Sequence, residues 1–188
     1  METPGVENQM RRLAFSTHDI AVLRQSIEIS EDLISDHFKI STSQWKRYRY
    51  DVQSLKDLAE DEITDVAFAQ VRRYAHCPSE RLRGSETGEY FKICLQDHMI
   101  FQALQRDPQI RLLPLSTYIV THELIHVVRF ARFLQHFQVS DRERETEERL
   151  VHSLTQQLLG PLKIPGLAEV LAAFENIGLM ETLVVAGG

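Results

Sequence analysis

Two histidines and a glutamate within five residues form the pattern in this chain that most clearly indicates metal binding or catalysis. Residues 122–126 read His-Glu-Leu-Ile-His. On a helix, positions i and i+4 lie on one face, so His122 and His126 can reach the same metal ion. Zinc accepts two imidazole nitrogens and one carboxylate at about 2.0–2.2 Å and keeps a fourth position for water. Glu123 lies beside that face, so the pattern predicts a zinc site with Glu123 as the general base that takes a proton from this water.

The alternative is an ordinary polar stripe on an exposed helix, and the neighbouring residues argue against it. Apolar residues surround the motif on most sides: Tyr118, Ile119, Val120, Leu124, Ile125, Val127, Val128 and Phe130. A helix that is apolar on most sides is buried, and buried polar groups need partners. A metal ion would supply that partner.

The third ligand is expected from the helix that follows, which begins near Asp141. Glu148 and His152 are four residues apart and share a face of this helix, at the point where it turns amphipathic. Glu148 is the predicted carboxylate ligand because it begins the apolar stripe. The competing candidates are Glu143, Glu145 and Glu147. Most of this acidic cluster is more simply the solvated start of a helix, which the helix dipole favours.

The two motifs together resemble the ImmA/IrrE group of gluzincin metallopeptidases. In that group a helix of the form E-x-x-x-N follows the HExxH helix, and Leu-Leu-x-Pro closes it at a fixed distance. Residues 147–161, EERLVHSLTQQLLGP, match this spacing without a gap. The resemblance covers about residues 90–161 and implies zinc, Glu123 as general base and hydrolysis of peptide bonds. It also implies that the strand expected at 90–95 is the edge strand along which zincins lay an extended peptide.

The chain departs from this group at two positions. His152 stands where the group has asparagine, a residue that accepts the second ring N–H of a ligand histidine. A neutral His152 could accept the same bond, or it could be a fourth ligand that displaces the catalytic water. Arg129 replaces a small or apolar residue, so the pocket is expected to differ. His98, just after the expected strand, and Tyr118, one turn before His122, are candidates for stabilising the transition state. The simpler interpretation is that His98 is a surface or satisfied histidine and that Tyr118 is a core residue.

Two other functions are compatible with these residues. A non-catalytic zinc domain for regulation or interaction would use a closed site of His122, His126, Glu148 and His152. A carboxylate-bridged di-iron bundle would need a second E-x-x-H besides Glu123 and His126, and the pair Glu148/His152 has the wrong spacing for it.

Several helices are expected to position these residues. Hydrophobic periodicity predicts mainly helix over residues 17–75, a long apolar helix over 115–137, and a last helix over 165–174. Ser140 and Asp141 start the helix of Glu148, and Gly160-Pro161 ends it. Residues 77–88 read as a loop. The clearest strand signal is the alternation of apolar residues over 90–95.

These elements predict an α+β fold, mostly helical, with a small sheet beside the HExxH helix. The resemblance makes it a zincin-like (gluzincin) fold. We expect a single domain over 1–188. It would comprise a helical N-terminal part (1–82), a zincin-like core (83–165), and a C-terminal helix and tail (166–188).

The amino-acid composition argues against some classes of binding partner. With 21 basic and 27 acidic residues, the net charge is −6, which argues against nucleic acid as the main partner. The basic and aromatic stretch at 45–50 is expected to serve helix packing instead.

The chain shows no apolar segment typical of a signal peptide or membrane span, so we expect a cytoplasmic location, no membrane partner, and a peptide or protein substrate. The oligomeric state stays open. Cys77 and Cys94 are expected to be reduced thiols.

Overall fold

The computed structural model describes residues 13–46, 48–74, 90–132 and 140–176. Within these ranges the chain begins with α1 (Thr17–Phe38), α2 (Thr42–Trp45) and β1 (Tyr50–Gln53), followed by two short 3-10 turns. Then come β2 (Ala69–Tyr74), β3 (Tyr90–Leu95), α3 (Asp97–Arg106), α4 (Leu112–Ala131), α5 (Asp141–Leu159) and α6 (Leu167–Asn176). The predicted α+β architecture, mostly helical with one small sheet, is therefore confirmed.

The sheet has three strands in the order β1-β3-β2. β1 runs parallel to β3, with Val52 opposite Ile93, and β2 runs antiparallel to β3, with Val71 opposite Ile93. The central position of β3 corrects the expectation that residues 90–95 form an edge strand. Among the described strands, β1 and β2 are the edges. A central strand already has neighbours on both sides and cannot pair with an added peptide.

The prediction of mainly helix over residues 17–75 is correct for α1 but wrong for residues 50–74. Both edge strands come from this segment, so the N-terminal part at 1–82 is not purely helical. The apolar residues of β2 and those just before it also fit helical spacing, which explains the error. Pairing with β3 decides their conformation, because strand propensity depends on the neighbouring strands more than on local sequence.

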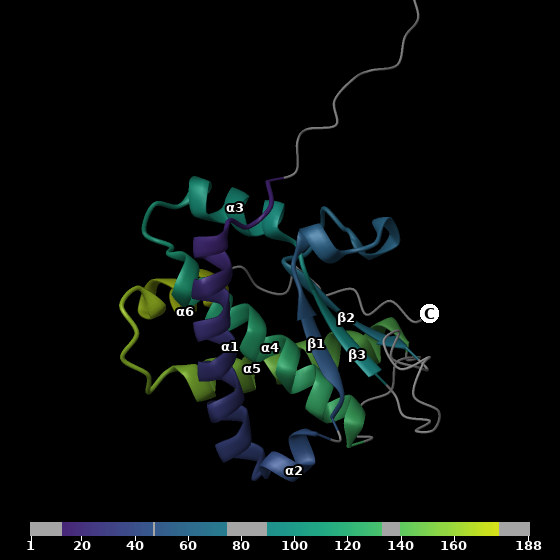
Figure 1. Cartoon of the computed structure of the whole chain (residues 1–188). Helices are drawn as coiled ribbons and strands as arrows, with labels where there is room; N and C mark the ends of the chain where they lie inside the picture. The colour runs from purple at the N-terminus through teal and green to yellow at the C-terminus, as the bar shows by residue number, and fades with distance from the viewer. Residues whose placement is uncertain (1–12, 47, 75–89, 133–139, 177–188) are drawn as a thin grey trace, which may run out of the picture.

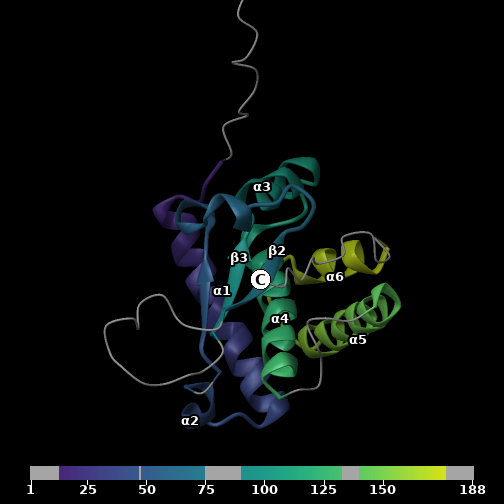
Figure 2. The ribbon, with the colours of Figure 1, turned by 90° about the vertical axis from the view of Figure 1, so that its right-hand side faces the viewer.

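α4 is the central element of the core, because it is covered on two sides. α1 and β2 pack on one side of it, as Figure 1 shows for α1. α5 and α6 pack on the other side, which is clearest in Figure 2. Nearly every residue of α4 from Pro114 to Phe130 is buried. The predicted apolar helix begins three residues earlier than expected, and residues 133–139 lie outside the described part.

The boundaries of α5 follow the sequence signals. Ser140 caps the helix: its hydroxyl accepts from the Glu143 amide at 3.3 Å, and the Glu143 carboxylate accepts from the Ser140 amide at 2.9 Å. Gly160 is the C-cap, and Pro161 cannot continue the helix. α6 begins two residues later than predicted. The expected loop at 77–88 lies outside the described residues, as does Cys77.

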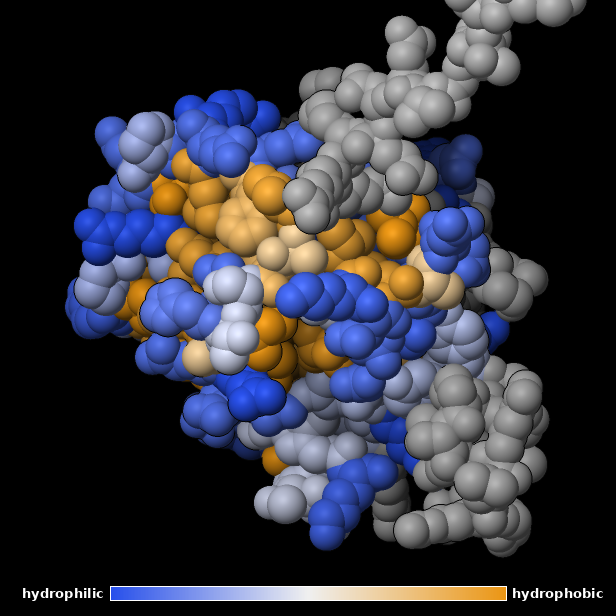
Figure 3. All heavy atoms as spheres, turned by 45° about the horizontal axis from the view of Figure 1, so that its top comes forward, coloured by the Kyte–Doolittle hydropathy of each residue, from blue (hydrophilic) through white to orange (hydrophobic). Residues whose placement is uncertain are grey.

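The surface keeps some apolar side chains in contact with solvent. In Figure 3 they gather in a band bordered by hydrophilic residues. Half-buried apolar residues of α1, α3 and α6 pack against the core. The most exposed large apolar residues in the described part are Leu13, Val66 and Leu150. None of the described helices combines the length and apolar character needed to cross a bilayer.

Candidate metal centre

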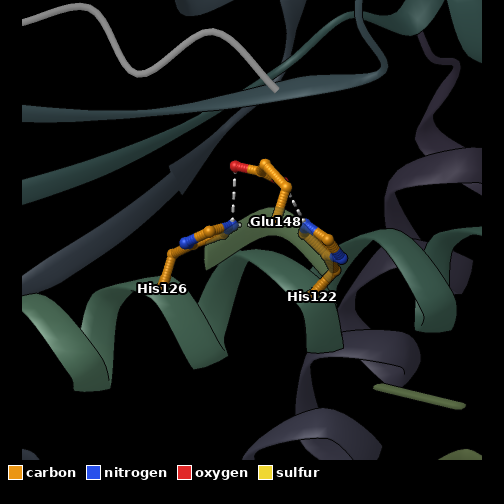
Figure 4. Close-up of side chains that lie close together, drawn as sticks. All are labelled: His122, His126 and Glu148. Atoms are coloured by element: carbon orange, nitrogen blue, oxygen red, sulfur yellow. Dashed lines mark hydrogen bonds and ion pairs between the residues drawn. The ribbon is translucent and has the colours of Figure 1, made fainter. Parts of the chain in front are cut away.

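Three side chains from two helices converge in the interior. His122 and His126 come from consecutive turns of α4, and Glu148 comes from α5 (Figure 4). The two Nε2 atoms are 3.2 Å apart. His122 Nε2 is 3.3 Å from Glu148 Oε2, and His126 Nε2 is 3.3 Å from Glu148 Oε1. All three residues are buried, and each offers a ligand atom within 4.8 Å of the others.

These separations are short enough for one metal ion to reach all three side chains. Ligand atoms about 2.1 Å from a common zinc ion, at tetrahedral angles, lie about 3.4 Å from one another. The separation of the two Nε2 atoms, 3.2 Å, is close to this value. Each histidine meets a different oxygen of Glu148 at 3.3 Å, and one ligand atom from each of the three residues lies within 4.8 Å of the others. Within the described ranges this is the single group of His, Cys, Asp and Glu side chains so arranged. The geometry therefore suits three protein ligands on one face of an ion.

The protonation states also suit metal binding. Burial lowers the pKa of His122 to about 4, so its imidazole is neutral at pH 7. Burial raises the pKa of Glu148, but the hydrogen bonds and charges of His122 and His126 outweigh it and lower this pKa to about 2. A neutral imidazole and an ionised carboxylate are the forms that ligate a metal ion.

Glu123 is next to the first ligand and has an unusual environment. It is 1% exposed, and neither carboxylate oxygen has a hydrogen-bond partner among the described residues. Burial raises its pKa to about 8. Buried polar atoms without partners are rare in folded proteins, and a carboxyl with a pKa near neutrality can accept and release a proton efficiently. Glu123 is thus a buried carboxyl beside the two histidines, with a pKa at which it can exchange a proton near neutral pH.

The hydrogen-bond partner that the structure gives His152 is neither of the two histidines of α4. Its Nδ1 is 2.6 Å from the hydroxyl of Tyr118 on α4, and it supplies no atom to the group of three. His122 Nδ1 has no hydrogen-bond partner among the described residues. The structure thus gives His152 a partner that neither sequence alternative contained. The signal was available: Tyr118 lies four residues before His122, on the ligand face of α4.

Tyr118 itself is a core residue, as predicted, with 2% exposure. Its ring stacks on Phe174 of α6, with ring centres 4.0 Å apart, and on His122, with centres 6.4 Å apart. Its hydroxyl is nevertheless polar and needs a partner in the interior, which His152 provides.

His98 is a candidate for stabilising the transition state, a role that requires a position beside the metal site, but its described contact is with another residue. It lies in the first turn of α3 and is 6% exposed. Its Nε2 is 2.7 Å from Asp65 Oδ1, and it is not part of the ligand group. The described contacts therefore give His98 a hydrogen-bond partner, Asp65, on the segment before β2.

The competing acidic residues have other partners. Glu143 caps α5 through Ser140, and Glu145 pairs with Arg149 on the same helix. Glu147 forms a two-pronged ion pair with Arg129 of α4, including a contact of 3.0 Å from Arg129 Nη2 to Glu147 Oε2. The sequence marked Arg129 as unusual but did not indicate this pair. Of the four acidic candidates, Glu148 is the one turned to the two histidines.

The chain was compared with protein-family models, curated proteins and solved structures, and none of them matched.

Proposed function

We propose that this protein is a zinc-dependent peptidase of the gluzincin type. His122, His126 and Glu148 hold the ion, and Glu123 is the general base. The observation that carries the proposal is the buried convergence of His122, His126 and Glu148, with a ligand atom from each within 4.8 Å of the others, beside the carboxyl of Glu123, for which the described residues offer no hydrogen-bond partner. The HExxH motif and its spacing to residues 147–161 support the same assignment.

The ion, when bound, acts as a Lewis acid that polarises the scissile carbonyl and acidifies the attacking water. Glu123 takes one proton from that water as the water oxygen bonds to the carbonyl carbon. The same carboxyl then gives the proton to the leaving amine nitrogen as the C–N bond breaks, so Glu123 ends as it began. Burial raises the pKa of Glu123 to about 8, which favours the protonated carboxyl at pH 7 in the metal-free chain. A cation bound beside Glu123 would favour the ionised carboxylate, which is the form that acts as the base.

The contacts of His152 favour this function over a closed zinc domain. A closed site would need His152 as a fourth ligand. Its Nδ1 pairs with Tyr118 instead, and the residue lies outside the group of three. Three protein ligands and an open position are typical of catalytic zinc sites, whereas four protein ligands are typical of structural ones.

Metal analysis and a peptide-cleavage assay test the proposal. The purified protein should contain about one zinc per chain and should cleave members of a peptide library, with products identified by mass spectrometry. Glu123→Gln should keep the zinc and lose cleavage on the order of 100-fold or more, because an amide cannot take the proton. Glu28→Gln, the same change at an exposed position of α1, is the matched control.

Two results would contradict the proposal. Iron in place of zinc would indicate an oxidative site, since non-haem iron also uses two histidines and one carboxylate. Full cleavage by Glu123→Gln, at wild-type zinc content, would exclude Glu123 as the base.

A further inference from the structure

Two polar cross-links join α4 to α5, and they lie on either side of the ligands. The first is the 2.6 Å contact between the Tyr118 hydroxyl and His152 Nδ1. The second is the ion pair of Arg129 with Glu147, in which both guanidinium contacts go to the one carboxylate. On α4, Tyr118 precedes His122 by one turn and Arg129 follows His126 by about one turn. On α5, Glu147 comes directly before Glu148, and His152 comes one turn after it.

α5 has little apolar contact of its own near Glu148. Its buried residues are Glu148, Val151, Thr155 and Leu159, so none of those before Val151 is apolar. The first turns of the helix are polar and largely exposed. The apolar stripe of α5 turns one face of the helix to the core, but its apolar members lie after Glu148 and set the rotation at Glu148 only coarsely, because apolar packing is not directional. A rotation by one residue would turn Glu148 by about 100°.

Directional bonds can select this rotation. The two attachment points on α5 are five residues apart, which is about 7.5 Å along the helix, and Glu148 lies between them. A bidentate arginine–carboxylate pair has a defined orientation, and the side chains of Arg129 and Glu147 are only 15% and 14% exposed. Tyr118 is held in turn by its stacking on Phe174. The Tyr118–His152 bond therefore starts from a ring that is itself held in place.

We propose that the Tyr118–His152 and Arg129–Glu147 cross-links are positioning contacts that hold Glu148 in ligand geometry against His122 and His126. The inference rests on the proposed metal site and adds the reason why Glu148, rather than a neighbouring glutamate, faces the two histidines. It also gives a use to Arg129 and His152, the two residues at which the chain departs from the group it resembles.

Variants of each cross-link test this inference. Tyr118→Phe removes only the hydroxyl and keeps the ring, and Arg129→Gln removes the ion pair. The matched controls are Glu145→Gln and Arg149→Gln, which break an exposed ion pair within α5 that does not reach α4. Zinc affinity is measured by competition with a chelating dye. Ligand geometry is measured by the visible absorption of Co²⁺ bound in place of zinc.

Each cross-link variant should bind zinc roughly 10–100-fold more weakly, the range for residues that orient ligands from outside the coordination sphere. The Co²⁺ spectrum should change in the same variants, while both controls keep the wild-type affinity and spectrum. The charge reversal Arg129→Glu with Glu147→Arg should recover affinity relative to either single reversal. Recovery would show that zinc affinity depends on the ion pair itself and not on either side chain alone.

Two other outcomes have distinct meanings. If the cross-link variants melt at lower temperature without metal, yet bind zinc and Co²⁺ as the wild type does, the contacts are only structural and the inference is wrong. If the wild type itself binds neither ion, the proposed metal site is wrong, and this inference falls with it.

Discussion

The Nε2 atoms of His122 and His126 lie 3.2 Å apart in the interior, and each is 3.3 Å from a different oxygen of Glu148. A divalent cation between them would replace weak contacts with three coordinate bonds. Because the site forms in the folded chain, a bound ion stabilises the folded state in proportion to the logarithm of its concentration.

Zinc should therefore raise the melting temperature. At zinc concentrations about 1,000 times the dissociation constant, the free energy of unfolding rises by about 4 kcal/mol. In a chain of this size that corresponds to on the order of 10 °C. Thermal denaturation with zinc and with a chelator measures the difference. His126→Ala should abolish it, and His18→Ala, which removes an exposed histidine of α1, should leave it intact. An unchanged shift in His126→Ala would exclude this ligand set.

The contact between His152 and Tyr118 predicts different effects for two substitutions. Asparagine places a polar atom at about the position of the histidine Nδ1, so His152→Asn can keep the bond to the Tyr118 hydroxyl. Leucine cannot. His152→Leu should weaken zinc binding roughly 10–100-fold, and His152→Asn should cost only a few-fold. Calorimetric zinc titration of both variants checks this order, and equal affinities would show that the hydrogen bond has no influence on the site.

A second buried charge cluster, on the sheet, predicts an acid-sensitive contribution to stability. Glu62 is 2% exposed, and its carboxylate accepts from Lys92 Nζ at 2.7 Å, from the Tyr74 hydroxyl, and from the Ala59 amide at 2.8 Å. Burial raises the pKa of Glu62, but these hydrogen bonds outweigh it and lower the pKa below its usual 4.5. The stabilisation is thus present above pH 4.5 and is lost as pH falls through the lower, folded-state pKa.

Glu62→Gln should accordingly destabilise the protein by about 2 kcal/mol at pH 7, as expected for a hydrogen bond to a charged partner. The difference from wild type should shrink as pH falls below about 4.5. Urea denaturation from pH 7 to pH 3 measures it, with Glu28→Gln as the exposed control. A difference that is constant over this range would mean that the ionisation of Glu62 does not contribute.

Cys94 should be chemically inert in the folded protein. It is fully buried in the central strand, and burial raises the pKa of its thiol to about 12. Only the thiolate reacts, so three pKa units reduce the reactive fraction on the order of a thousandfold. In a Cys77→Ser background, a thiol-labelling reagent should modify Cys94 only when urea unfolds the chain. Rapid labelling under native conditions would show that this part of the sheet opens.

The features of the site that depend on a few neighbouring residues could be predicted from the sequence. His122 and His126 share a face because helix geometry alone relates positions i and i+4. Ser140 and Gly160-Pro161 bound α5 because capping and the missing proline amide act over a few residues. The alternation over 90–95 predicted β3, and the apolar surroundings of the HExxH motif predicted that α4 is buried.

Tertiary structure decided the rest, because it depends on how separate elements are oriented. Four glutamates on α5 were candidates for the third ligand, and the rotation of α5 over α4 turns Glu148 to the histidines and Glu147 to Arg129. His152 bonds Tyr118, thirty-four residues away, which no local spacing encodes. β1 and β2 form only because β3 provides backbone partners on both sides. Local geometry thus placed His122 and His126 on one face, whereas long-range packing decided that Glu148 joins them and that His152 and Glu147 bond to α4.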